Sequence, residues 1–282
     1  MNVSTLSSPG SRAHFYDAAR PERARRAAHD ITSGLCRWRL AVSLARLDIR
    51  NRYRGSVLGP FWMTVSTAVM VAGIGLLYST LFKLPLREYL PWLAVSLLIW
   101  NTISQTVSDG CQSFISAEGM IRQLPLPFTV HVLRFVVRNA LIAAHSLPLI
   151  AVVLIGTGNI PGPEAVLVVP GLLLLAINSC AAGLLLGMVC ARFRDMPQIV
   201  TNIMQLFFFL SPILWKPELL GDNARWLPLN PFYALMEPVR GPLLTGEVSM
   251  ATWAAALGYT TVGCAVAFAF FVRFRGRLAF WV

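Results

Sequence analysis

The sequence predicts an all-α integral membrane protein with six transmembrane helices, an N-terminal amphipathic interface helix, and re-entrant helices between the fifth and sixth spans. Of its 282 residues 56% are hydrophobic and only 13% are charged, and the mean hydropathy of +0.61 is too high for a soluble domain of this length. Crossing a bilayer takes about twenty apolar residues in a helix. No apolar stretch alternates with the period of a membrane strand, so every span is predicted to be a helix.

The chain is predicted to open with a polar cytosolic extension, residues 1–32, and an amphipathic helix, residues 33–56. The extension is rich in arginine, lacks the apolar core and cleavage site of a signal peptide, and is expected to be poorly ordered. In the next segment apolar residues recur at helical spacing among arginines, at Leu35, Trp38, Val42, Ala45 and Ile49. This pattern favours a helix at the cytosolic headgroup boundary, with a solvated helix as the alternative.

Residues 57–282 are predicted to form the membrane domain. The six spans are placed at Phe61–Phe82, Leu90–Asp109, Val130–Ile155, Ala165–Cys190, Gln198–Trp215 and Ala251–Val272. With this layout 19 of the 24 lysines and arginines fall on the side of the N-terminus. Both termini are therefore predicted to be cytosolic, and the net charge of +11 is explained by anionic lipid rather than by nucleic acid.

The stretch between the fifth and sixth spans is irregular. It contains Pro212, Pro217, Pro228, Pro231, Pro238 and Pro242, which are too many for a spanning helix. Apolar residues are nevertheless interleaved with these prolines. Short helices that re-enter the membrane under the shelter of protein would reconcile both features, and a plain extracytoplasmic loop is the alternative.

Several kinds of chemistry have no motif in this sequence. The only lysines, Lys83 and Lys216, do not follow a glycine-rich phosphate loop, so the chain is not expected to hydrolyse ATP alone or to hold a cofactor. His131 and His145 have no acidic neighbour in sequence, and the five cysteines are scattered singly, so neither catalysis nor a metal site is predicted.

Charged residues within the predicted spans are also few. Asp109, Arg134 and Arg138 lie close to span ends, where their side chains could reach the interface by snorkelling. Coupling to an ion gradient is therefore disfavoured.

Four segments resemble the type-2 ATP-binding-cassette export permeases, and most of all the O-antigen and polysaccharide exporters. They are "RNRYRGSVLGPFWMTVS" at 50–66, "EGMIRQLPLPFTVHVLR" at 118–134, "RFRDMPQI" at 192–199 and "LNPFYALMEPVRGPLL" at 229–244. The resemblance runs from about Leu40 to the C-terminus. It implies a homodimer in the bacterial inner membrane, each subunit docked on a separate ATPase subunit that binds ATP and magnesium. The cargo it implies is a polyprenyl-diphosphate-linked glycan.

The resemblance also implies an ATPase-coupling helix at Ser116–Leu126. Its predicted coupling residues are Ser116, Glu118, Gly119, Met120, Arg122 and Gln123. Glu118 and Arg122 are four residues apart and can stabilise a short helix, while Pro125 and Pro127 would end it. An ordinary connector with solvated charges is the alternative.

Two further sets of residues follow from the same resemblance. The predicted outer gate comprises Pro231, Phe232, Tyr233, Glu237 and Arg240, in which the last two could pair with each other or with the second subunit. The predicted substrate-binding residues are Arg50, Arg52, Arg54, Tyr78, Trp100, Phe207 and Phe208. The arginines could attract the diphosphate and the aromatic rings could face sugars, although lipid anchoring and core packing explain such residues equally well.

Two other functions remain open at this point. One is a membrane-embedded transferase of lipid-linked sugar metabolism, which the absence of an acid–base or metal-ligand constellation disfavours. The other is a drug or small-lipid exporter of the same permease class.

Overall fold

The computed structural model describes residues 22–59, 61–81 and 83–282, and every regular element in these ranges is helical. The N-terminal helices are α1 (Arg23–Cys36) and α2 (Trp38–Arg52). The helices of the bundle are α3 (Phe61–Leu81), α4 (Leu86–Gln112), α5 (Glu118–Gln123), α6 (Phe128–Ala144), α7 (Leu147–Thr157), the 3-10 helix η1 (Pro163–Leu167), α8 (Val168–Arg192), α9 (Met196–Leu210), the 3-10 helix η2 (Pro217–Leu229), α10 (Pro231–Leu244) and α11 (Met250–Trp281).

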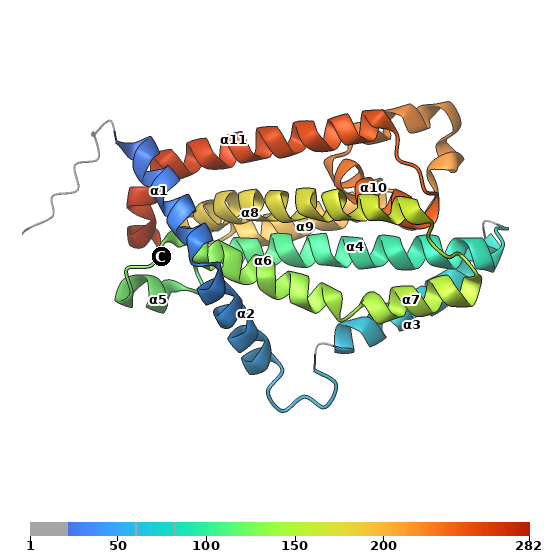
Figure 1. Cartoon of the computed structure of the whole chain (residues 1–282), viewed down its shortest axis with the longest axis horizontal. Helices are drawn as coiled ribbons and strands as arrows, with labels where there is room; N and C mark the ends of the chain where they lie inside the picture. Colours follow the sequence, from blue (N-terminus) through green and yellow to red (C-terminus); the bar gives the residue numbers. More distant parts are fainter. Residues whose placement is uncertain (1–21, 60, 82) are drawn as a thin grey trace, which may run out of the picture.

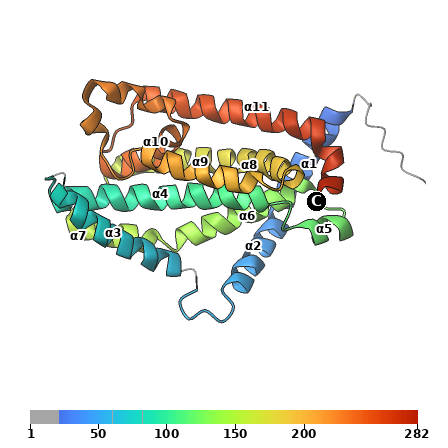
Figure 2. The ribbon, with the colours of Figure 1, turned by 180° about the vertical axis from the view of Figure 1, so that it is seen from behind.

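The long helices lie roughly side by side, with α1, α2, α5 and the end of α11 gathered at one end of the bundle (Figure 1). We call this the basic end, because most arginines of the described chain belong to these elements and to the adjoining start of α6. At the opposite end lie α10, η2 and the loops that join α3 to α4 and α7 to η1. Figure 2, the view from behind, shows α9 in front of α8, and α9 contacts α4 and α8.

The N-terminal helices differ from the prediction in extent. α1 begins at Arg23, so residues 23–32 are helical and not poorly ordered, and a break at Arg37 divides the predicted interface helix in two. Residues 1–21 lie outside the described part. The face that packs on α6 is made of small residues, including Gly34, Ala41 and Ala45, because these allow close approach. The predicted apolar residue Trp38 is 56% exposed and so does not pack on the bundle.

The predicted third span is interrupted. Val130–Ile155 was expected to be one helix, but α6 ends at Ala144 and α7 begins at Leu147. Pro148 explains the break, because it has no N–H to donate and its ring clashes with the carbonyl of the preceding turn. Thr64 of α3 contacts the residues between the two helices: its hydroxyl lies 3.0 Å from the hydroxyl of Ser146.

The boundaries of the later spans also shift. The predicted fifth span reached Trp215, but α9 ends at Leu210, because the residue before Pro212 adopts an extended conformation. The sixth span was placed at Ala251–Val272, whereas α11 continues to Trp281 and reaches the basic end. The predicted end of the first span, Phe82, lies outside the described residues.

Four helical segments in the described chain are long and apolar enough to cross a membrane by length and composition. They are Phe61–Leu81, Phe128–Thr157, Pro163–Arg192 and Met250–Trp281. The second predicted span is helical as α4, but polar residues in its second half lower its hydropathy, and α9 has only 15 residues. The fold is thus an all-helical membrane-type bundle, and the count of six spans stays a prediction.

α8 lies at the centre of the bundle, in contact with α4, α6, α10 and α11. Glycines permit this, because a Cβ added to Gly171 would lie 2.5 Å from the carbonyl oxygen of Pro238 in α10. A Cβ added to Gly187 would lie 2.3 Å from the hydroxyl of Ser113, just after α4. Small residues at helix crossings are a general means of bringing membrane helices together.

We predict that Gly171→Ala destabilises the fold, because the added methyl group meets main-chain atoms that cannot move aside. Overpacking of this kind costs about 1–3 kcal/mol. The matched control is Gly258→Ala in α11, where nothing lies within 4 Å and alanine is the better helix former. Thermal unfolding of the two detergent-purified variants should show a lower midpoint for Gly171→Ala alone. Equal midpoints would contradict the packing assigned to α8.

Candidate functional site

A short helix does form in the predicted coupling segment. α5 comprises Glu118–Gln123, and Ser116 lies in the turn that precedes it. Glu118 and Arg122 form an ion pair of 2.8 Å, and Arg122 also donates a hydrogen bond of 2.8 Å to a main-chain oxygen of Val282. Gly119 faces open space, with nothing within 4 Å of an added Cβ. α5 therefore presents one face to the end of α11 and leaves the other free.

The helix after α5 is tied to two others by the carboxylate of Asp30 in α1. Asp30 is 2% exposed and accepts hydrogen bonds from the backbone and hydroxyl of Thr129, at 3.1 and 3.0 Å, and a longer one from the N–H of Phe128. Its second partner is Arg275 of α11, whose Nε lies 2.9 Å away. A carboxylate at a helix N-terminus satisfies free N–H groups and complements the helix dipole. Asp30 thus joins α1, the start of α6 and α11.

The charged residues of the predicted spans form ion pairs and do not reach the interface separately. Arg134 of α6 forms a two-pronged ion pair with Asp48 of α2. Arg138, one turn further along α6, bridges Asp48 at 3.2 Å and Asp109 of α4 at 2.8 Å. All four side chains are mostly buried, so each charge needs its partner. This network holds α2, α4 and α6 together.

A polar stripe runs along the second half of α4. Its members are spaced at three and four residues, at Asn101, Ser104, Gln105, Ser108, Asp109 and Gln112. The spacing places them on one helix face. Because polar groups that face lipid are costly, this face of α4 is expected to lie against protein or water.

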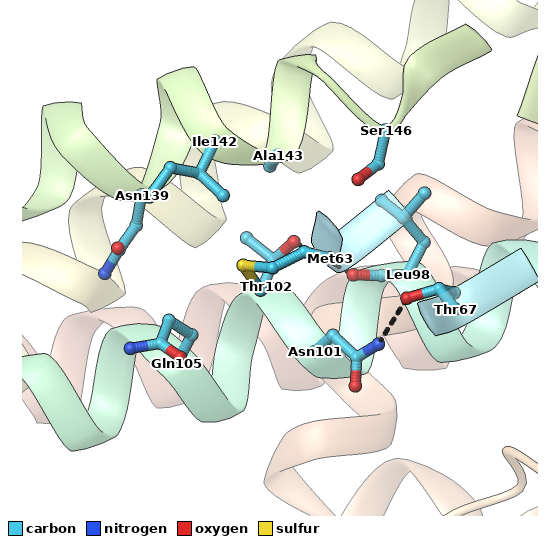
Figure 3. Close-up of a pocket in the computed structure, with 10 residues that line it drawn as sticks. All are labelled: Met63, Thr67, Leu98, Asn101, Thr102, Gln105, Asn139, Ile142, Ala143 and Ser146. Carbon is cyan, nitrogen blue, oxygen red and sulfur yellow. Dashed lines mark hydrogen bonds between the residues drawn. The ribbon is translucent and has the colours of Figure 1, made fainter. Parts of the chain in front are cut away.

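Cavities open along this stripe between α3, α4 and α6. One of about 360 Å³ is lined by the stripe and by α3 residues such as Trp62 and Ser66. A smaller one, about 20 Å³ and large enough for about one water, lies beside Asn139 (Figure 3). Figure 3 shows the Asn101 amide donating to the Thr67 hydroxyl, at 3.2 Å. The side chain of Asn139 is 3% exposed, and neither amide atom has a partner in the described chain.

α3 covers only part of the stripe. Thr67, in the second turn of α3, meets Asn101, and the two helices run in opposite directions. The portion of α4 after Ser108 therefore lies beyond the start of α3. Gln112, the last member of the stripe, is exposed, whereas the other members are only partly exposed. The polar stripe is thus least covered toward the basic end.

The structure brings the predicted aromatic residues to the predicted gate. The rings of Trp100 and Phe208 are 5.9 Å apart, and Phe232 lies 5.4 Å from Trp100 and 4.8 Å from Phe207. Trp100 is only 5% exposed. Within one subunit these rings form a core between α4, α9 and α10 rather than the wall of an open channel, and Tyr78 packs against the same core.

Arg240 is the centre of the predicted gate. It is fully buried and forms an ion pair with Glu237, with its Nε 2.9 Å from the carboxylate. Its other donors reach the hydroxyl of Ser96 at 2.9 Å and the carbonyl of Pro212, while its guanidinium stacks on Trp92, 3.7 Å from the ring centroid. Every face of this cation is therefore occupied, which fixes α10 against α4.

The remaining gate and substrate residues are placed as follows. Pro231 begins α10 after Asn230, whose side chain accepts hydrogen bonds from the N–H groups of Phe232 and Tyr233 and so caps the helix. Arg50, Arg52 and Arg54 are exposed at the end of α2. Of these three, Arg52 lines a cavity with Arg134 and Arg138.

The sequence reasoning overlooked three groups. The polar stripe of α4 was visible as a periodic pattern inside an apolar span. The pairing of Asp48 with Arg134 and the clamp around Asp30 join residues far apart in the chain, and no local signal marked them.

Comparison with known proteins agrees with this architecture. Residues 39–244 match the family described as ABC-2 type transporter. The chain is 29% identical over 204 residues to the O-antigen export system permease protein RfbA of Myxococcus xanthus, an alignment that covers 70% of this chain and 77% of that protein. It is 25% identical over 219 residues to a protein of the same name from Klebsiella pneumoniae, covering 74% and 82%. The family match spans most of the bundle, and the chain belongs to the ABC-2 type transporter family.

Proposed function

We propose that this chain is the permease subunit of an ATP-driven exporter that moves a polyprenyl-diphosphate-linked, O-antigen-like polysaccharide across the bacterial inner membrane. The observation that carries this proposal is the similarity to O-antigen export permeases over 70% or more of the chain, within an ABC-2 family match. A drug exporter of the same class would not require the long polar stripe of α4. A sugar chain, with many hydroxyl groups, suits such a surface.

In this proposal the basic end faces the cytosol, and all six long helical segments span the membrane. The arginines gathered around α1, α2 and α5 support the orientation through the positive-inside rule. α4 counts as a span because it runs beside α8 inside the bundle, where its polar residues are sheltered from lipid. α9 is short and is completed by the turn that follows it. The exposed Leu35 and Trp38 then lie at the headgroup level.

Energy comes from a separate ATPase subunit that docks on α5. The exposure of α5 supports this, since Glu118 and Arg122 remain 44% and 62% exposed and offer one charge of each sign at the basic end. Movement of α5 would pass along the chain to α6 and through Asp30 to α1 and α11. Rigid-body movement of packed helices is a common way to carry such a signal.

The cargo path is proposed to run along the polar stripe and to be completed by a second copy of the chain. α3 covers only part of the stripe, so one subunit alone would expose the rest of it to lipid. At the opposite end, η2 and α10 form the re-entrant pair that closes the mouth. The buried Arg240–Glu237 pair supports a fixed gate position.

The orientation predicts opposite labelling of two open positions. In a background without the five cysteines, we introduce Gly119→Cys in α5 or Asp222→Cys in η2. Both sites are exposed, so neither change should disturb the fold. A membrane-impermeant maleimide applied to spheroplasts should label position 222, and should label position 119 only after permeabilisation. The reverse pattern would rule out a cytosolic basic end.

Docking of the ATPase subunit on α5 predicts that exchanging the charges of this helix uncouples export from ATP hydrolysis. The double variant Glu118→Arg with Arg122→Glu keeps an ion pair within the helix but reverses the pattern shown to a partner and removes the contact with Val282. ATP hydrolysis by the assembled complex should continue while glycan export falls at least about tenfold, as expected for loss of charge-assisted contacts.

The matched control exchanges the exposed pair Glu22 and Arg26 of α1, which has the same spacing. Export should be little changed there. Normal export by the α5 double variant would refute the coupling role, whatever the cargo.

A further inference from the structure

A cavity of about 380 Å³ lies at the end of the bundle opposite the basic end. It is formed by the start of α4, the end of α7, the start of η2 and the end of α10, and it is separate from the polar stripe. Its volume falls within the range of about 300–1,000 Å³ that is usual for small-molecule sites. Its lining includes Arg87, Glu88, Trp92, Asn159, Lys216 and Glu218, none of which the sequence analysis assigned to a site.

The walls of this cavity are fixed by contacts between the elements that form it. α7 ends with Gly158 in the left-handed conformation, with a φ of 75°, and Nε of Arg87 donates a hydrogen bond of 2.7 Å to the carbonyl of Thr157. A cation at the C-terminus of a helix is favoured by the helix dipole. The hydroxyl of Tyr89 donates to the carbonyl of Leu214, which holds the segment before η2 against the start of α4. The cavity is therefore preformed.

Two cations and two carboxylates line the cavity without pairing with one another. Arg87 and Lys216 are positive and Glu88 and Glu218 are negative, so their charges cancel. None of the four forms an ion pair among the described residues. Strong donors and strong acceptors are thus available around one space, and the net charge favours neither an anion nor a cation.

We propose that this cavity binds a neutral saccharide unit. A hydroxyl group both donates and accepts hydrogen bonds, so one sugar ring can use cationic donors, carboxylate acceptors and the amide of Asn159 together. Trp92 adds an aromatic surface for the C–H groups of the ring. A phosphate group would be repelled by both glutamates and a polyamine by both cations, so neither suits this lining as well.

The cavity adjoins the predicted gate through Trp92. The guanidinium of Arg240 stacks on this ring, 3.7 Å from its centroid, and Leu244 and Thr245 at the end of α10 also line the cavity. A bound saccharide would therefore contact residues that hold α10 against α4. This inference deepens the proposed function and rests on it for the source of the sugar. With the basic end in the cytosol, the cavity faces outward and would receive a sugar unit that has passed the gate.

The test uses the purified full-length chain in octaethylene glycol monododecyl ether, a detergent without sugar, and saturation-transfer NMR. Maltose, mannobiose and chitobiose are titrated separately, without ATPase. We expect saturable binding of at least one disaccharide, which neither pyrophosphate nor spermidine displaces. Glu88→Ala and Glu218→Ala should each weaken this binding about tenfold, the effect of one lost charge-assisted hydrogen bond.

Glu164→Ala is the matched control, because Glu164 is an exposed glutamate at the same end of the bundle that does not line the cavity. Glu218 lies in η2 and outside the bundle core, so its variant should fold even if the Glu88 variant does not. Equal affinities in the Glu164 and Glu218 variants, displacement by either charged probe, or no binding of any disaccharide would overturn the inference.

The outcome is independent of the proposed function, because the assay measures binding and not export. A chain that binds a disaccharide but exports no glycan in cells would support the site and refute the proposed function. A chain that exports glycan but binds no disaccharide would leave the proposed function standing and remove the site.

Discussion

The charges of α6 constrain the whole basic end of this protein. Arg134 and Arg138 lie on a largely apolar helix, and a buried guanidinium is tolerated only with a carboxylate close by. One carboxylate comes from α2 and the other from α4. Satisfying the two arginines therefore fixes the N-terminal helix against the bundle and sets the position of α4.

α4 serves two purposes, and its sequence is divided accordingly. Residues 91–100 are all buried and form the core with α9 and α10, so this half behaves as an ordinary interior helix. The half after Asn101 carries the polar stripe and is only partly covered. A helix built in this way is less apolar than the four long apolar segments, although it packs against α3, α7 and α8. Burial against protein, rather than apolar composition, is what makes such a helix compatible with a membrane.

Local sequence signals predicted the elements well and their connections poorly. The short helix before Pro125 and the proline-rich segment after α9 were visible because proline and charge spacing act over a few residues. Pro148 and Pro212 carried the same kind of signal, and weighting them fully would have given the break in α6–α7 and the early end of α9. The start of α1 was missed because residues 23–32 are polar, and their helix depends on the burial of Ala27 and Asp30 against α6 and α11. No sequence pattern reports such tertiary support.

The polar contacts at the two ends of the bundle differ in how far they permit the helices to move. At the opposite end each guanidinium nitrogen of Arg240 has a partner and an aromatic ring lies beneath the cation, so displacing α10 would break the contacts of a buried charge. At the basic end the carboxylate of Asp30 accepts hydrogen bonds from the start of α6 and pairs with Arg275 of α11. It thereby links these two helices near α5. If α5 moves, α6 and α11 must either follow together or lose their shared carboxylate. A shift of α5 would therefore act on α6 and α11 together, whereas α10 at the opposite end keeps its position unless its contacts with α4 are broken.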